Sequence, residues 1–280
     1  MSADPSEAPK NVVELVRGES RVVIDSQRGA ITTHFSVGDR SILYLDAATL
    51  ADPRKNVRGG IPVLFPTPGK LTNDRWAFSA YEGSQPQHGF ARKQPWQVVE
   101  RYDHEVTLRL DQPATPDWPW PCSLQIRYLL DGATLRLEPR VTNRGSTDMP
   151  FGLGFHPYFA VAQADKAALR IPTAATRGWD NVTKRSVAVP VRVDLSAKEV
   201  DLRLDDHGQN HAQLVWADGR TITIGTCETL SRWVIWTLAG SDFVCLEPWT
   251  CPGDAVNTGA QLLVLPPNGS HDFWLDITAA

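Results

Sequence analysis

The sequence lacks the features that mark several large classes of protein. No apolar run among its 280 residues approaches the ~18 residues that a membrane-spanning helix requires. Basic residues form no long run and the net charge is −4, so a surface that tracks nucleic-acid phosphates is not indicated. The first ten residues are polar and lack the apolar core of a signal peptide. We therefore expect no membrane and no nucleic-acid partner, a flexible tail over residues 1–10 and a cytoplasmic location.

Cysteine is scarce, and its spacing does not favour zinc or redox motifs. No two of the four cysteines have the C-x-x-C spacing; they are Cys122, Cys227, Cys245 and Cys251. His207 and His211 are four positions apart, which would suit a metal on a helix, but Gly208 and the neighbouring acidic residues favour a solvated turn. We expect free thiols in a reducing compartment, no metal and no cofactor.

Helical periodicity is also missing. No long segment has apolar residues spaced 3.6 positions apart, and 21 prolines argue against long helices. Alternating or β-branched runs predict strands at 20–25, 31–37, 41–46, 96–102, 106–111, 124–131, 134–142, 187–195 and 200–204. No linker divides the chain. We expect one all-β domain over residues 11–280, built from two large antiparallel sheets packed face to face.

Tight-turn dipeptides lie between several of these runs. Asp131-Gly132 separates LQIRYLL from ATLRLEP, and Asp218-Gly219 separates AQLVW from RTITIGT. Asp-Gly suits a two-residue hairpin, because both central residues of that turn need a positive φ. The dipeptides therefore predict antiparallel pairing of consecutive strands.

Two segments rich in glycine and proline interrupt the strand pattern. Residues 58–69, RGGIPVLFPTPG, form a rigid run that is either a crossover between strands or the wall of a cleft with Arg58 at its rim. Residues 85–92, QPQHGFAR, bring together Gln87, His88 and Arg92, which can hydrogen-bond the hydroxyl groups of a sugar or a phosphate. Both segments are candidates for a binding site.

Two further segments each place one titratable group in an apolar setting. His156 lies in FGLGFHPYF at 151–159, and Glu247 follows the apolar run VCL, just before a loop rich in proline and glycine. A satisfied core histidine and an edge carboxylate facing water are the structural alternatives. An enclosed histidine and a partly desolvated carboxyl group are also how a general acid and a general base are made.

Taken together, the segments resemble the aldose 1-epimerase (mutarotase) family, in particular its hexose-6-phosphate mutarotase branch. The matching stretches follow the family's order: RGGIPVLFP at 58–66, PQHGFAR at 86–92, GFHPYF at 154–159 and EPWTCPGDAVNTG at 247–259. The closing segment LLVLPPNGSHDFWLDI is also similar. The resemblance implies a galactose-mutarotase-like β supersandwich with a broad open cleft.

The resemblance also implies roles for individual residues. It assigns the general acid to His156 and the general base to Glu247. The substrate-binding residues that it implies are His88, Gln87, Arg58, Arg92 and, by its position between the catalytic pair, Asp180. The sequence FPTPG at 65–69 departs from the FPQFG-like pattern of the phosphate branch and is closer to branches that act on unphosphorylated sugars. A hexose and a hexose 6-phosphate both stay open as substrates.

The predicted function is interconversion of the α and β anomers of such a sugar by general acid–base ring opening. We expect His156 and Glu247 to face each other across a gap the width of one pyranose. One alternative is a non-catalytic carbohydrate-binding or regulatory protein on the same fold. Another is a glycoside hydrolase or lyase in which Asp180 or Asp254 partners Glu247. We expect a monomer or weak homodimer with a small sugar as its only partner.

Overall fold

The computed structural model describes residues 11–280, so the predicted tail over residues 1–10 lies outside the described part. Within that part, the only α-helices are α1 (Ala47–Ala51) and α2 (Ala255–Thr258), and 3₁₀ turns supply the remaining helix. The predicted scarcity of helix is confirmed. None of the described helices is long and apolar enough to cross a membrane.

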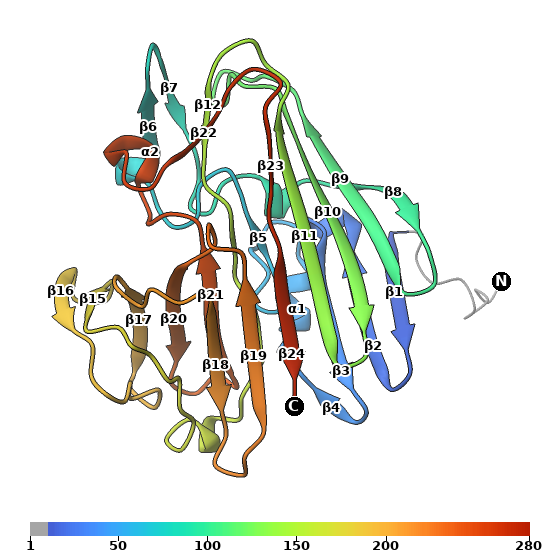
Figure 1. Ribbon diagram of the computed structural model, residues 1–280, viewed down its shortest axis with the longest axis vertical. Coiled ribbons are helices and arrows are strands. Elements are labelled where there is room, and N and C mark those ends of the chain that lie inside the picture. Colours follow the sequence, from blue (N-terminus) through green and yellow to red (C-terminus); the bar gives the residue numbers. More distant parts are fainter. Residues whose placement is uncertain (1–10) are drawn as a thin grey trace.

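Two large antiparallel sheets dominate the molecule (Figure 1). The first runs in the order β18 (His211–Val215), β19 (Thr221–Thr226), β24 (Leu275–Ala279), β11 (Thr134–Asn143), β10 (Cys122–Asp131), β9 (Glu105–Gln112) and β8 (Gln97–Arg101), with β23 (Ser270–Asp272) beside β11. The second runs in the order β16 (Arg185–Ala188), β15 (Arg177–Asp180), β17 (Glu199–Leu204), β20 (Arg232–Leu238), β21 (Phe243–Trp249), β13 (Gly154–Phe155) and β5 (Val63–Leu64), with β14 (Tyr158–Ala160) beside β21.

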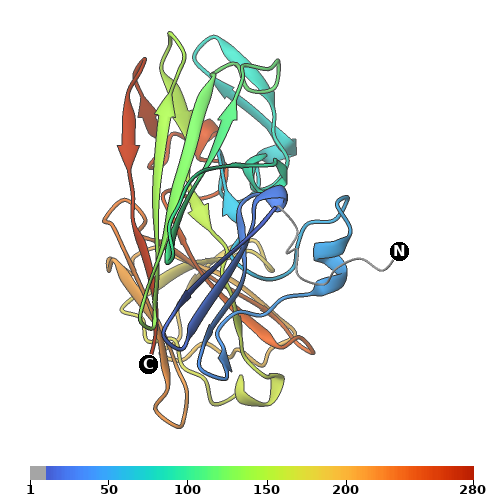
Figure 2. The same ribbon diagram turned by 90° about the vertical axis from the view of Figure 1, so that its right-hand side faces the viewer.

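Three smaller sheets complete the fold. A four-stranded meander of β1 (Val12–Arg17), β2 (Ser20–Asp25), β3 (Ile31–Val37) and β4 (Arg40–Ser41) packs against β9 and β10 (Figure 2). The two hairpin-like pairs are β6 (Arg75–Phe78) with β7 (Tyr81–Ser84), and β12 (Met149–Phe151) with β22 (Leu263–Leu265). The pair β6–β7 lies beside α2.

The inner faces of both large sheets contribute to one apolar core, in which Ile126 of β10 and Leu246 of β21 are members of the same buried cluster. Strand β21 is unusual because every one of its residues is buried. Since side chains alternate across a strand, Leu246 faces the core while Cys245 and Glu247 face the opposite side. That opposite side of the second sheet is where the cleft described below is found.

Most of the strand predictions are confirmed. The runs at 20–25 and 31–37 match β2 and β3 residue for residue, and those at 96–102, 106–111, 124–131, 134–142 and 200–204 match strands to within two residues. The prediction for 41–46 was wrong beyond Ser41, because only isolated bridges remain there and Asp46 caps α1. The prediction for 187–195 was wrong beyond Ala188, where Pro190 has no N–H to offer a neighbouring strand.

Both Asp-Gly segments join antiparallel strands as predicted, but neither dipeptide forms the two central residues of a two-residue turn. Asp131 pairs with Thr134 across β10 and β11, so Gly132 and Ala133 form a two-residue hairpin loop. Val215 instead pairs with Thr221, so the connection that contains Asp218-Gly219 has five residues, 216–220, rather than two.

Gly60 and Gly132 differ in how much space surrounds the position that a side chain would occupy. Both have positive φ, but a Cβ at Gly60 would lie 2.3 Å from the carbonyl oxygen of Thr32, whereas one at Gly132 would meet nothing within 4 Å. Gly132→Ala is expected to lower the free energy of unfolding by about 1–2 kcal/mol, and Gly60→Ala by roughly 3 kcal/mol or more. Urea denaturation of both variants tests this, and equal losses would contradict it.

Candidate active site

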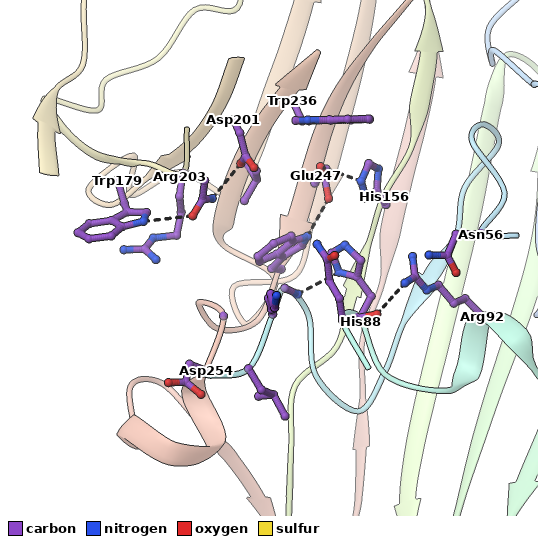
Figure 3. Close-up of a pocket in the computed structure, with 18 of the residues that line it drawn as sticks. Asn56, His88, Arg92, His156, Trp179, Asp201, Arg203, Trp236, Glu247 and Asp254 are labelled. Carbon is purple, nitrogen blue, oxygen red and sulfur yellow. Dashed lines mark hydrogen bonds and ion pairs between the residues drawn. The ribbon is translucent and has the colours of Figure 1, made fainter. Parts of the chain in front are cut away.

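A cleft of about 860 Å³ lies on the exposed side of the second large sheet (Figure 3). Its walls come from loops that are distant in sequence and from the cleft-facing side chains of β15, β17, β20 and β21. It brings together six of the seven residues predicted as functional, which are Arg58, Gln87, His88, Arg92, His156 and Glu247. The seventh, Asp180, does not line it.

His156 lies in the short turn between β13 and β14. Its backbone N–H donates to the carbonyl of Pro62 at 3.1 Å, which ties the turn to the segment that leads into β5. Its imidazole stacks on the ring of Tyr158 at 4.7 Å and meets the edge of Trp236 at 5.6 Å. A Cβ at Gly154 would lie 2.7 Å from Trp249, so the glycine of the GFHPYF motif lets β13 approach β21 closely. These contacts fix one orientation of the imidazole.

Glu247 lies within β21 rather than at its end, opposite Val234 of β20. Its Oε2 accepts a hydrogen bond from Nε1 of Trp249 at 3.2 Å. Its Oε1 lies 3.3 Å from Nε2 of His156. The expectation of a gap as wide as a pyranose was therefore wrong, because the two groups are in direct contact. Direct contact is compatible with the predicted ring opening. The two sugar oxygens that would exchange protons, O1 and the ring oxygen O5, are bonded to the same carbon.

Burial controls the charge of this pair. Desolvation, followed by the nearby positive charge of Arg92, lowers the pKa of His156 to about 3. Desolvation, followed by the negative charge of Asp201, raises the pKa of Glu247 well above its ordinary value. Both effects favour uncharged groups, so the pair shares one mobile proton. The proton is on the carboxyl group when both partners are uncharged and on the imidazole when both are charged.

His88 is a second buried imidazole, whose ring lies 5.7 Å from that of His156. Its Nδ1 accepts the backbone N–H of Gly69 at 3.0 Å. Desolvation lowers its pKa well below the ordinary value. A neutral His88 with Nδ1 as acceptor carries its proton on Nε2, so it offers one fixed hydrogen-bond donor.

Arg58 and Arg92 supply positive charge on the His156 side of the cleft. Arg92 donates to the backbone carbonyl of Gln87 at 2.6 Å, while its buried Nε has no partner among residues 11–280. The guanidinium of Arg58 lies over the ring of Trp236 at 5.8 Å. Within residues 11–280, neither arginine forms an ion pair with a carboxylate. Both charges are therefore available to an anionic ligand.

Asp180 is not the acidic residue of the cleft. Its carboxylate accepts hydrogen bonds from the backbone N–H of Val182 at 2.8 Å and from the hydroxyl of Thr183 at 2.8 Å, and so stabilises its own turn. Asp201 of β17 lines the cleft instead. Its Oδ1 accepts from Nδ2 of Asn181 at 2.8 Å, and Oδ1 of Asn181 accepts from Nε1 of Trp179 at 3.1 Å. Asp201 is thus held by a two-step chain of hydrogen bonds.

The sequence carried a weak signal for Asp201. Asp201 is the neighbour of Leu202 in β17. Because Leu202 packs in the core, Asp201 lies on the opposite face of the strand. Only the register shows that this face continues into the site, because Asp201 pairs with Trp236 and Trp236 pairs with Cys245.

The histidines four positions apart do not form a metal site. Nε2 of His207 lies 2.9 Å from the backbone carbonyl oxygen of His211, and its Nδ1 lies 2.7 Å from the hydroxyl of Thr173. Both nitrogens of this ring already have partners, in agreement with the interpretation as a turn.

Comparison with known proteins identifies the family. The aldose 1-epimerase family model matches residues 11–278. The chain is 25% identical over 240 residues to the protein YihR of Escherichia coli (strain K12), which covers 77% of each chain. A relative from Cenchrus ciliaris, provisionally named a glucose-6-phosphate 1-epimerase, is 27% identical over 202 residues, or 62% of this chain and 57% of the relative.

Solved structures share the fold of this chain. The Slr1438 protein of Synechocystis sp. PCC 6803 superposes with a TM-score of 0.92 at 32% identity, covering 100% of this chain and 99% of the other. A galactose mutarotase-like protein from Lactobacillus casei ATCC 334 shares the fold, with a TM-score of 0.78 at 21% identity and coverage of 96% and 100%. The predicted galactose-mutarotase-like fold is confirmed, and the chain belongs to the aldose 1-epimerase family.

Proposed function

We propose that this chain interconverts the α and β anomers of a hexose 6-phosphate, with His156 as general acid and Glu247 as general base. The observation that carries the proposal is the 3.3 Å contact between Nε2 of His156 and Oε1 of Glu247 on the floor of the cleft. This places a proton donor and a proton acceptor side by side. A mutarotase needs both groups at one carbon atom.

The steps balance without any further reactant. Starting from the charged form of the pair, with the shared proton on the imidazole, Glu247 takes the proton of the O1 hydroxyl, His156 gives its proton to O5, and the C1–O5 bond breaks to leave an aldehyde. Rotation about C1–C2 presents the other face of the carbonyl. O5 then attacks that face, while the two groups exchange roles. His156 takes back the proton of O5 and Glu247 returns its proton to O1, which restores the starting state.

The position of the arginines supports a substrate with an anionic group at C6. O5 is bonded to C5, which carries C6, so a residue that protonates O5 lies on the C6 side of the sugar. Arg58 and Arg92 lie on that side, and both are close enough to His156 to lower its pKa. Figure 3 has Asp201 on the other side of the pair, where it would accept hydrogen bonds from sugar hydroxyls.

The first prediction concerns the catalytic pair. His156→Ala and Glu247→Gln are each expected to reduce turnover by about 10²–10⁴-fold, because each removes one proton-transfer group. NMR measurement of anomer exchange, after subtraction of the uncatalysed rate, tests this, with thermal unfolding as the control for folding. A variant with near-normal exchange would sink the assignment. Sugar binding without any acceleration by the unmodified protein would instead identify a carbohydrate-binding protein.

The second prediction concerns the substituent at C6. Arg58→Gln is expected to lower kcat/KM for glucose 6-phosphate by about 10–100-fold and for glucose by less than about 3-fold, because only the phosphate loses a charge-assisted hydrogen bond. Lys184→Gln is the matched control, since Lys184 also lines the cleft and its replacement removes the same charge. An equal loss in both variants would mean that only overall charge matters. Equal losses for both sugars would exclude a phosphate contact.

The third prediction concerns Asp201. Asn181→Ala removes the donor that holds its carboxylate, and is expected to raise KM by about 5–10-fold with a smaller change in kcat. Trp179→Phe, which keeps an aromatic ring but removes the N–H, is expected to act in the same direction more weakly. Thr183→Val is the control, because it removes a partner of Asp180, which lies outside the cleft. A control effect as large as that of Asn181→Ala would contradict this account.

A further inference from the structure

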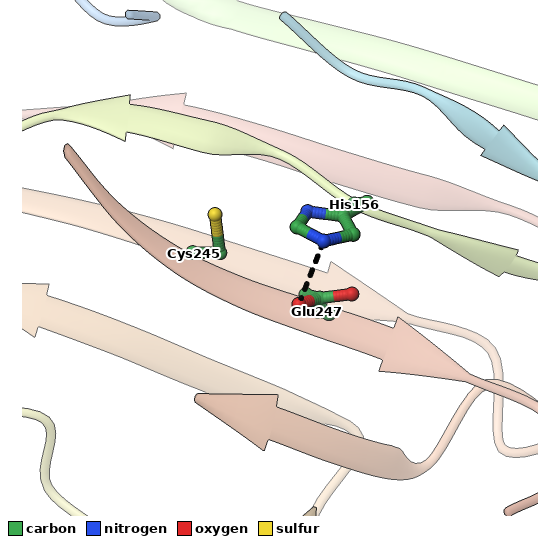
Figure 4. Close-up of side chains that lie close together, drawn as sticks. All are labelled: His156, Cys245 and Glu247. Atoms are coloured by element: carbon green, nitrogen blue, oxygen red, sulfur yellow. Dashed lines mark ion pairs between the residues drawn. The ribbon is translucent and has the colours of Figure 1, made fainter. Parts of the chain in front are cut away.

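We propose that His156, Cys245 and Glu247 form a binding site for a thiophilic divalent cation such as Zn²⁺, and that the bound ion blocks the sugar reaction. Figure 4 shows the three side chains close together, with Cys245 beside the contact between His156 and Glu247. The blocking effect rests on the proposed function, whereas binding of the ion does not.

The strand geometry brings the sulfur to the pair. Cys245 and Glu247 are two positions apart on β21, so both side chains leave the same face of the sheet. His156 approaches this face from the turn after β13. A ring nitrogen of His156, Sγ of Cys245 and a carboxylate oxygen of Glu247 all lie within 4.8 Å of one another.

These separations are close to what a zinc ion requires. Three atoms that are mutually within 4.8 Å share a point no farther than about 2.8 Å from each, whereas bonds from zinc to nitrogen, oxygen and sulfur are about 2.0–2.3 Å long. Movements of at most about 0.5–0.8 Å per ligand therefore suffice, which rotation of side chains supplies. The 3.3 Å between Nε2 of His156 and Oε1 of Glu247 is already the edge of a tetrahedron with such bonds.

The donor set selects the class of ion. One sulfur, one nitrogen and one oxygen suit Zn²⁺ or Co²⁺, while Mg²⁺ prefers six oxygen ligands in an octahedron. A thiolate and a carboxylate together carry two negative charges, which neutralise a divalent ion in this buried setting. On binding, Cys245 gives up its thiol proton, and the proton shared by the pair is released as well.

The fourth coordination position opens toward the cleft, because His156 and Glu247 line it whereas Cys245 lies beneath. An ion held there occupies the lone pairs with which the pair exchanges protons. It therefore competes with the sugar for the same space. Within residues 11–280, no other cysteine shares such a group with two further His, Cys, Asp or Glu side chains.

Cobalt absorbance tests binding without reference to turnover. Co²⁺ titrated into the metal-free protein is expected to give a thiolate-to-cobalt charge-transfer band, which persists in Cys251→Ala and disappears in Cys245→Ala. Cys251 is the matched control because it is also buried but lies outside the group. Glu247→Gln, which keeps the thiol, is a second variant and is expected to weaken Co²⁺ binding by about 10-fold or more. An absent band, or a band retained in Cys245→Ala, would overturn the site.

Inhibition tests the consequence. Zn²⁺ is expected to inhibit anomer exchange competitively with the sugar, and Mg²⁺ at the same concentration to leave it unchanged. Cys245→Ala is expected to exchange anomers at the normal rate and to need about 10-fold more Zn²⁺ for the same inhibition. Equal inhibition of Cys245→Ala and the unmodified protein would overturn the proposal. A cobalt band in a protein that does not accelerate exchange would refute the proposed function and leave the metal site intact.

Discussion

The organisation of the cleft depends on the contact between His156 and Glu247. Each group alone would be costly to bury, because a desolvated charge or an unpaired polar atom loses its interaction with water. Together they need only one proton between them. The second large sheet provides the setting, since β21 is buried along its whole length and lies between β20 on one side and β13 and β14 on the other. A strand at the sheet edge would leave the carboxyl group hydrated and ionised.

The site contains buried polar groups that lower the stability of the fold and that an apolar core would not contain. Nδ1 of His156 is buried without a partner within the described residues. Asp201 places a second carboxyl group near Glu247 and raises its pKa further. Well-packed apolar side chains at such positions are often at least as stabilising as a buried polar pair. These buried polar groups depart from the usual pattern of an apolar, fully hydrogen-bonded core. The proposed reaction requires a proton shared by the pair, and such departures are expected at functional sites.

The sequence predicted the features that depend on local residue patterns, but not those that depend on how the strands pair with one another. Alternation located most strands, and His156 and Glu247 stood out because each interrupts an apolar run. The choice between Asp180 and Asp201 could not be made in the same way. Both lie in short strands, and only the register from β17 through β20 to β21 brings Asp201 to the cleft. Asp180 is adjacent in sequence to a cleft residue, Asn181, but its carboxylate bonds within its own turn.

The charged residues of the cleft are distributed unevenly around His156 and Glu247, with the arginines near one and Asp201 near the other. In the proposed reaction, ring opening and closure use the same two groups in exchanged roles, so the pair by itself does not determine which way round a sugar binds. The surroundings do, because Arg58 and Arg92 lie beside His156 while Asp201 lies near Glu247. In the reverse orientation, the phosphate of the proposed substrate would leave both arginines without a counter-charge and would meet Asp201 as well as Lys184, which also lines the cleft. Attraction in the proposed orientation is therefore the main source of specificity.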